Sequence, residues 1–290
     1  MVLFEGFETL TVPGADGVPV HVRTAGQGPS LLLLHGFPQT HAMWHAVAPR
    51  LAEDFTVVVT DLRGYGASGG PAAGADRPGA GHSKRAMAAD QVRVMAALGH
   101  ERFSLAGHDR GARCAYRLAL DHPERVERLA VLDVVPTANA LADIDAEGAR
   151  QLWRWFVLGQ PYPVPERLIA ADPEGFLFAA HRALFAPEAL EAYRAAVARP
   201  GVVHAMCEDY RAMFGPDLAH DRADQRAGRR IGAPLLALWG KRAHVEARHD
   251  VLAVWRGWAD DVRGRALDCG HFLPEEAPEE TYAELRAFFA

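Results

Sequence analysis

The chain has 290 residues, a length that suits two ordinary domains or one large α/β domain with an insertion. Its hydrophobic content of 49% and charged content of 23% exclude an intrinsically disordered protein. The formal net charge of −6 argues against a broad nucleic-acid-binding surface.

The cysteines and the apolar runs bear on the cellular compartment. Cys114, Cys207 and Cys269 lie far apart without a CxxC pair, which argues against a disulfide framework or a zinc site. Residues 1–10 lack the basic start and long apolar stretch of a secretion signal. No apolar run approaches the ~18 residues that span a bilayer. We therefore expect a cytoplasmic protein that binds neither nucleic acid nor membrane.

The first half of the chain alternates between strand and helix patterns. Short apolar or β-branched runs predict strands, and longer amphipathic segments predict helices. The strands are expected over 18–23, 30–34, 56–60, 103–106 and 126–132, and the helices over 41–52, 84–98 and 110–120. The glycine-rich segment 69–81 is predicted to be a loop within one sheet, because the strands on both sides of it belong to that sheet.

The pattern then changes. Residues 137–230 contain no strand-like run but much helical periodicity. Strand character returns at 234–239 and 262–268, before a final helix over 278–289. These patterns predict an α/β fold with a mostly parallel, doubly wound sheet and an inserted helical cap over its carboxyl edge. The predicted units are a core, 1–136 and 231–290, and a cap, 137–230.

A sharp turn between a strand and a helix is predicted at residues 107–111, GHDRG. Such a turn requires small residues two positions before and after its centre, and the nucleophile elbow, usually G-x-S-x-G, has the same spacing. The centre here is Asp109, a carboxylate that the N-terminus of the next helix keeps ionised. Taken alone, the motif fits a nucleophile and an ordinary helix N-cap about equally.

The partners of Asp109 favour the nucleophile. An alkyl ester on an aspartate must be hydrolysed, and His271 follows the last predicted strand, in the chain order of an α/β-hydrolase triad. The strand after the cap ends without a carboxylate, whereas the strand before it ends at Asp133, so we assign Asp133 to orient His271. The structural alternatives are a capping or core histidine and a turn-forming aspartate.

The turn HGFP at 35–38 follows another buried strand. The backbone N–H groups of Phe37 and Arg110 are predicted to form an oxyanion hole beside Asp109, and an ordinary turn proline is the alternative. These signals occur in order, each at the end of a strand. Together they predict an α/β-hydrolase fold.

Two arginines, Arg110 and Arg113, follow Asp109 on one face of the first helical turn. Cations near a helix N-terminus are unfavourable by roughly 0.3–1 kcal/mol each. The presence of two such arginines therefore suggests a functional role. An anionic substrate at about 4 Å from Asp109 meets a repulsion of about 4 kcal/mol at an effective dielectric constant near 20, and an arginine pair offsets it. We expect the two arginines to hold a substrate carboxylate; surface arginines or a salt bridge to the cap are the alternatives.

Five segments, in order over nearly the whole chain, resemble the fluoroacetate (haloacetate) dehalogenases: HGFPQT at 35–40, AGHDRGAR at 106–113, AVLDVVPT at 130–137, CEDYRA at 207–212 and GHFLPEEAP at 270–278. The resemblance implies hydrolysis of short 2-haloacids through an alkyl-ester intermediate, without metal or cofactor, by a homodimer. It implies these roles: nucleophile Asp109, base His271, its partner Asp133, and a carboxylate clamp of Arg110 and Arg113.

The resemblance also implies halide donors in the cap. Trp155 and Tyr210 match the donors of the family, and a packed cap aromatic is the alternative for each. Two departures concern this halide pocket. Arg154 stands where the family usually has a histidine, and the cap is shortened within 173–193, where a further tryptophan of the family has no counterpart. Arg154 could line the halide pocket or point away to pair with a cap carboxylate.

Two other functions are weighed against the dehalogenase. An epoxide hydrolase shares the aspartate, the HGxP turn and the histidine, but it needs two cap tyrosines, for which Tyr210 with Tyr162 or Tyr193 are the candidates. The arginine pair argues against it. A capped binding protein without catalysis is the third alternative, and the intact set of Asp109, Asp133 and His271 argues against that.

Overall fold

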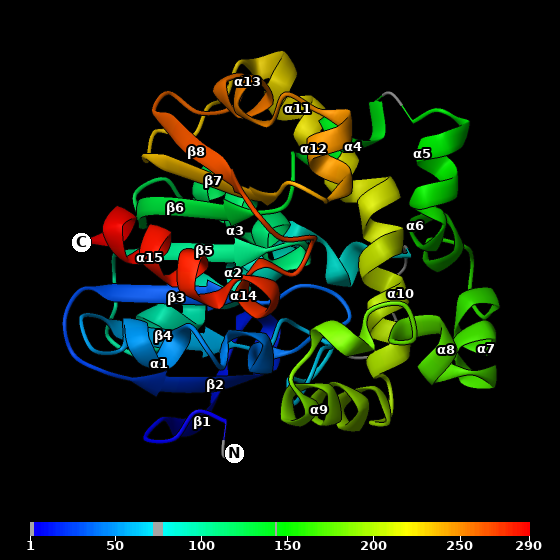
Figure 1. The fold of residues 1–290 in the computed structure, drawn as a ribbon, viewed down its shortest axis with the longest axis horizontal. Coiled ribbons are helices and arrows are strands. Elements are labelled where there is room, and N and C mark those ends of the chain that lie inside the picture. The colour runs from blue at the N-terminus through cyan, green and yellow to red at the C-terminus, as the bar shows by residue number, and fades with distance from the viewer. Residues whose placement is uncertain (1–2, 72–77, 143) are drawn as a thin grey trace.

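The computed structural model describes residues 3–71, 78–142 and 144–290. Eight strands form one sheet: β1 (Glu8–Pro13), β2 (Pro19–Ala25), β3 (Ser30–Leu34), β4 (Thr56–Thr60), β5 (Phe103–His108), β6 (Val126–Leu132), β7 (Leu235–Gly240) and β8 (Val262–Leu267). Their order across the sheet is β1-β2-β4-β3-β5-β6-β7-β8 (Figure 1). The pairs β1–β2 and β2–β4 are antiparallel and all others are parallel. The predicted α/β fold with a mostly parallel sheet is confirmed.

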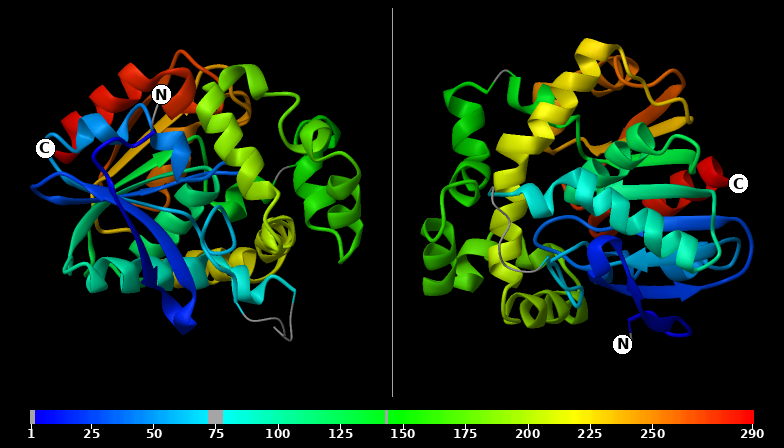
Figure 2. Two further views of the ribbon diagram at one scale, coloured as in Figure 1. Left: turned by 90° about the horizontal axis from the view of Figure 1, so that it is seen from below. Right: turned by 180° about the vertical axis from the view of Figure 1, so that it is seen from behind.

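The central strands are buried on both faces. The four leucines of β3 and the three valines of β4 have no exposed surface. Such continuous apolar runs are typical of parallel strands that helices cover on both sides. Helices α1 (Ala48–Leu51) and α15 (Pro278–Phe289) cover one face, and α2 (Lys84–Ala97) and α3 (Arg110–Asp121) cover the other (Figures 1 and 2).

Short helical turns connect these elements in the core. They are η1 (Ala15–Gly17), η2 (His41–Trp44), η3 (Ala80–His82), α12 (His244–Arg248), α13 (Val251–Arg256) and α14 (Leu273–Glu276). Of these, α12 follows β7 and α14 follows β8, so both lie beyond the carboxyl ends of parallel strands. The carboxyl edge of such a sheet is where α/β proteins build their sites.

Between β6 and β7 the described residues form helices, which we call the helical insertion. They are α4 (Thr137–Ala142), α5 (Ala146–Gln151), α6 (Trp153–Leu158), α7 (Val164–Ala171), α8 (Pro173–Leu177), η4 (Arg182–Leu184), α9 (Pro187–Val197), α10 (Val202–Ala212), the π-helix η5 (Met213–Asp217) and α11 (Leu218–Ala227). Figure 1 shows the helical insertion beside the ends of the central strands. Within the described ranges, no helix is both long and apolar enough to span a membrane.

Two elements differ from the sequence predictions. The single helix expected over 41–52 is broken into η2 and α1, and Pro49, which lacks a backbone donor, stands in the first turn of α1. Strand β1 was not predicted, because most of its residues are exposed and it pairs only with β2 at the sheet edge. In the predicted loop 69–81, residues 72–77 lie outside the described residues, and η3 begins within it at Ala80.

Candidate active site

The turn that carries Asp109 brings backbone segments so close together at two positions that no side chain fits there. Asp109 has φ 46° and ψ −113°, between the end of β5 and the start of α3. A Cβ at Gly107 would lie 2.5 Å from the backbone of Gly111, and a Cβ at Gly111 would lie 2.5 Å from the carbonyl oxygens of Leu34 and His35. Only glycine fits at these positions. The strained turn therefore presents the Asp109 side chain at the carboxyl edge of the sheet.

Three predicted residues meet there. Asp133 ends β6 and His271 follows β8; the His271 Nδ1 lies 2.6 Å from Asp133 Oδ2. The other Asp133 oxygen accepts the Gly240 N–H at 2.9 Å, which fixes the carboxylate. The His271 Nε2 lies 4.0 Å from Asp109 Oδ2. The histidine thus has one nitrogen bonded to Asp133 and the other directed toward Asp109.

The charges of this group shift each other's pKa. Burial alone would lower the pKa of His271, but the hydrogen bond and charge of Asp133, and the charge of Asp109, raise it to about 8. Burial would raise the pKa of Asp109, but His271 and Arg110 together with the Phe37 N–H hold it below its usual range. Asp109 is therefore ionised near neutral pH, as a nucleophile requires.

The HGFP turn also lies beside Asp109. The Phe37 N–H donates to Asp109 Oδ2 at 3.0 Å. The Arg110 N–H opens helix α3 directly after Asp109, where no intrahelical acceptor is available. Both predicted oxyanion donors are thus backbone groups next to the carboxylate.

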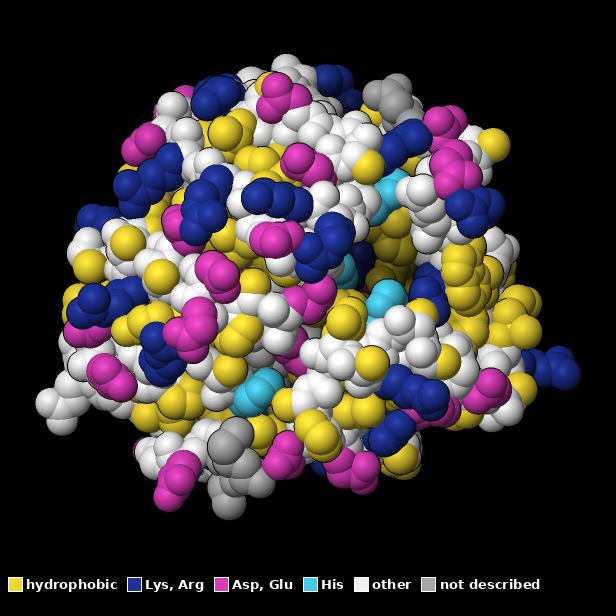
Figure 3. Space-filling model, in the orientation of Figure 1, with side chains coloured by type: hydrophobic (Ala, Val, Ile, Leu, Met, Phe, Trp, Pro, Cys, Tyr) yellow, Lys and Arg dark blue, Asp and Glu magenta, His cyan; other side chains and the backbone are white. Residues whose placement is uncertain are grey.

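A cavity of about 250 Å³ opens in front of Asp109, between the core and the helical insertion. Figure 3 shows this face hollowed there, with histidine side chains at the rim. Of the predicted residues, the cavity is lined by Phe37, Asp109, Arg113, Asp133, Arg154, Trp155, Tyr210 and His271.

The two arginines that follow Asp109 differ in their surroundings. Arg113 lines the cavity, is 2% exposed, and donates from Nη1 to the Val135 carbonyl at 3.2 Å and to Thr137 Oγ1 at 3.0 Å. Its Nε is buried without a partner, and its Cζ lies 5.3 Å from the ring centroid of Trp155. Within the described residues Arg113 contacts no carboxylate. Its buried charge thus has no anionic partner in the part of the chain that the structure describes.

Arg110 turns the other way. Its Nε and Nη2 donate to both oxygens of Asp209 on α10, which also accept from Lys84 and from Tyr65. Arg110 is not among the residues that line the cavity. The sequence placed both arginines on one face toward a substrate carboxylate; the structure brings only the side chain of Arg113 to the cavity, because a buried carboxylate of the helical insertion holds Arg110.

The three halide-pocket candidates all line the cavity. The Tyr210 ring lies edge-on to Phe37, with centroids 5.1 Å apart. Arg154 donates from Nε to the Phe176 carbonyl at 3.1 Å and stacks on Trp153, with its Cζ 4.7 Å from the ring centroid. Among the described residues it pairs with no carboxylate. Arg154 therefore forms part of the cavity wall, and the pairing with a cap carboxylate that the sequence left open for it is not formed within the described residues.

Sequence reasoning missed several residues of the site. His181 lines the cavity from a stretch that contains no recognisable motif. His108 lies inside the GHDRG motif; its Nε2 is 2.8 Å from the His271 carbonyl, and burial lowers its pKa to about 3, so it is a neutral donor. Glu276 accepts the N–H groups of Gly270 and Phe272 and so holds the loop of His271. Glu276 belongs to the segment GHFLPEE, and its position close after His271 is the sequence feature that could have identified it.

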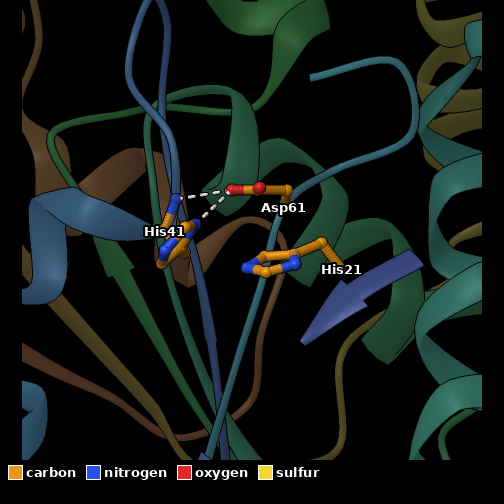
Figure 4. A group of neighbouring side chains, drawn as sticks. All are labelled: His21, His41 and Asp61. Atoms are coloured by element: carbon orange, nitrogen blue, oxygen red, sulfur yellow. Dashed lines mark hydrogen bonds and ion pairs between the residues drawn. The ribbon is translucent and has the colours of Figure 1, made fainter. Parts of the chain in front are cut away.

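One other cluster has metal-ligand chemistry. His21, His41 and Asp61 bring ligand atoms within 4.8 Å of one another (Figure 4). None of the three lines the cavity. However, Asp61 Oδ1 already accepts the backbone and ring N–H groups of His41, and Oδ2 accepts the Ala67 N–H. The carboxylate is engaged in holding its own loops, and we assign no metal to it.

Known proteins resemble this chain over nearly its whole length. Residues 29–278 match the family described as alpha/beta hydrolase fold. The chain is 43% identical to a fluoroacetate dehalogenase of Burkholderia sp., over 99% of this chain and 95% of that protein. It is 31% identical to a soluble epoxide hydrolase of Corynebacterium sp. (strain C12), over 95% of each. A crystal structure from Nostoc sp. PCC 7120, named as an α/β hydrolase, superposes with a TM-score of 0.93 at 49% identity, over 98% of each chain.

Proposed function

The chain belongs to the α/β-hydrolase family, and we propose that it is a hydrolytic dehalogenase of short 2-haloacids. The observation that carries this proposal is the unpaired, buried Arg113 in the same cavity as Asp109. A buried charge without a partner destabilises a fold, and a substrate carboxylate would be the missing partner. A neutral haloalkane or epoxide would leave it unpaired. The 43% identity to a fluoroacetate dehalogenase supports the same function.

In the first step, Asp109 attacks the carbon that carries the halogen. Arg113 binds the adjacent carboxylate and so offsets its repulsion from Asp109. A bond forms between an Asp109 oxygen and the carbon while the carbon–halogen bond breaks. The halide leaves toward Trp155 and Tyr210, with Arg154 as the third candidate in that pocket. The product of this step is an alkyl ester on Asp109.

In the second step, His271 takes a proton from a water that attacks the ester carbonyl. The N–H groups of Phe37 and Arg110 stabilise the oxyanion that forms. Collapse releases the 2-hydroxyacid and restores the Asp109 carboxylate. Because the ester carries no charge, Asp109 no longer raises the pKa of His271 in the intermediate, and the histidine becomes a better base when it is needed.

This change of charge predicts the pH dependence of turnover. Hydrolysis needs neutral His271, so kcat should rise with pH, with a midpoint below the value of about 8 that holds while Asp109 is ionised. Asp133 contributes most to the raised pKa, so Asp133→Asn should move the midpoint lower still. The kcat of both forms with chloroacetate between pH 5 and 10 measures this. A midpoint that is the same in both forms would contradict the assigned pairing of Asp133 with His271.

Epoxide hydrolysis is the alternative function, and the 31% identity to a soluble epoxide hydrolase supports considering it. It needs a second tyrosine beside Tyr210 to protonate the epoxide oxygen. Of the two candidates, Tyr162 is 68% exposed, and Tyr193 donates its hydroxyl to Glu275. Neither lines the cavity. This arrangement favours the dehalogenase.

Halide release separates the two functions. We expect chloride and bromide from chloroacetate and bromoacetate, and little diol from styrene oxide. Fluoroacetate should be slower, because fluoride departs well only from a small, dry pocket with several focused donors, whereas this cavity opens to the surface (Figure 3). Ion chromatography with a boiled-enzyme control measures all four reactions. Diol formation without halide release would overturn the proposed function.

A further inference from the structure

We propose that Arg154 forms a second anion subsite in the cavity, so that the haloacids taken by this site include 2-halodicarboxylates such as 2-chlorosuccinate. This inference rests on the proposed function. The reaction stays the same, and the inference adds a class of substrate for the same site. It assigns Arg154 to a distal carboxylate of the substrate rather than to the departing halide.

The first observation is that two arginines from different layers of the protein line one cavity. Arg113 comes from α3 of the core and Arg154 from α6 of the helical insertion, and both line the cavity. Among the described residues, neither contacts a carboxylate. A monocarboxylate such as chloroacetate can pair with only one of them. A dicarboxylate can pair with both.

The second observation is the geometry of Arg154 itself. Its only hydrogen bond within the described residues runs from Nε to the Phe176 carbonyl, and the ring of Trp153 supports the flat face of the guanidinium. These contacts fix the orientation of the group, and none of the described residues accepts a hydrogen bond from Nη1 or Nη2. A paired set of N–H donors in one plane matches the two oxygens of a carboxylate. A halide ion is a single acceptor atom, so it matches this pair of parallel donors less well than a carboxylate does.

The neighbours of Arg154 do not neutralise it. His181 lines the cavity nearby, and burial with the charges of Arg154 and His271 lowers its pKa, so it stays neutral at pH 7 and can donate an N–H. The Tyr210 hydroxyl has a pKa well above its usual range, because burial and the charge of Asp109 raise it, so it is also neutral. The positive charge of Arg154 therefore has no anionic neighbour among the described residues, and a ligand carboxylate would supply one.

The third observation is space. The cavity has a volume of about 250 Å³, many times the ~10–15 Å³ that a cavity needs to hold one water. That is more room than chloroacetate needs. With 2-chlorosuccinate, Arg113 holds the carboxylate next to C2 and Arg154 the distal carboxylate. Asp109 displaces chloride from C2, and water then hydrolyses the ester to 2-hydroxysuccinate, with the proton leaving through His271.

The test compares 2-chlorosuccinate with 2-chlorobutyrate, which has the same number of carbons and the same leaving group but no second carboxylate. The values of kcat/KM are measured for wild type, Arg154→Gln and Arg150→Gln. Arg150 is the matched control, since it is 72% exposed on α5, pairs with Glu147 and does not line the cavity. The wild type should prefer the dicarboxylate by about tenfold or more. Arg154→Gln should abolish that preference, and Arg150→Gln should keep it.

The outcomes separate the alternatives. If Arg154 served the halide, Arg154→Gln would lower kcat/KM equally for both substrates and leave their ratio unchanged, which overturns the subsite. A wild type that prefers 2-chlorobutyrate overturns it as well. If the wild type releases no chloride from chloroacetate, the proposed function is wrong. The subsite is then tested by the binding of succinate, which does not depend on catalysis. Succinate should then raise the Tm of wild type more than butyrate does, an excess that Arg154→Gln removes; equal shifts contradict the inference.

Discussion

Replacing Arg113 by Met should lower kcat/KM for chloroacetate by about 30-fold or more. Removing one partner of a desolvated charge pair costs ~2–5 kcal/mol, and each ~1.4 kcal/mol is a factor of ten. The loss should be large here because Arg113 is 2% exposed and the Arg110 side chain, bound to Asp209, is not at the cavity to replace it. Steady-state kinetics of the two forms with chloroacetate measure the effect.

Chloroacetamide is the control for this prediction, because it has the same carbon–chlorine bond without the carboxylate. Its kcat/KM should fall far less in Arg113→Met. The Tm of the variant should change little, because removal of a buried charge without a carboxylate partner offsets the loss of the hydrogen bonds to Val135 and Thr137. Equal losses on both substrates, or a markedly lower Tm, would mean that Arg113 supports the fold and not the substrate.

Replacing Asp109 by Asn should reduce turnover of chloroacetate by about 10⁴-fold or more, as is typical when a nucleophile is removed. The substitution keeps the size of the side chain but removes the charge that attacks carbon. The strained backbone at residue 109 and the Phe37 hydrogen bond should tolerate the amide. Circular dichroism and Tm establish that the fold is retained, and chloride release measures the loss.

Asp109→Ala is the companion variant, because a slow hydrolysis of the amide would regenerate aspartate and restore activity. We expect the alanine variant to stay inactive on prolonged incubation. The neighbouring carboxylate, Asp133, is held by the Gly240 N–H and by His271 Nδ1, so it should not substitute for Asp109. Activity above one hundredth of wild type in a folded Asp109→Ala would exclude Asp109 as the nucleophile.

The sequence was most informative where the chain requires one backbone geometry or one chemistry. The glycines around Asp109 are needed because a Cβ at either would collide with backbone atoms, and that requirement is visible as a motif. The central strands were visible as continuous apolar runs, because both of their faces are covered. The edge strand β1 lacks this signature, since it is largely exposed.

Contacts between distant segments could not be predicted. A salt bridge to the cap was an alternative for both arginines, but Arg110 and Asp209 are 99 residues apart, and nothing in either segment identifies Asp209 as the partner or separates Arg110 from Arg113. The same holds for Arg154, whose direction depends on Phe176 and Trp153 in the helical insertion. His181 reaches the cavity through the path of the chain between α8 and η4, a stretch that has no periodic pattern of its own.

The most direct test of the central claim is the mass of His271→Asn after exposure to chloroacetate. This variant keeps Asp109 and Arg113 but lacks the base that activates water, so the ester should form and persist. Intact-mass spectrometry should show one added carboxymethyl group, which peptide mapping assigns to the segment that contains Asp109. An Asp109→Ala, His271→Asn double variant should show no addition. An unmodified mass of His271→Asn after full exposure to chloroacetate would contradict the two-step mechanism.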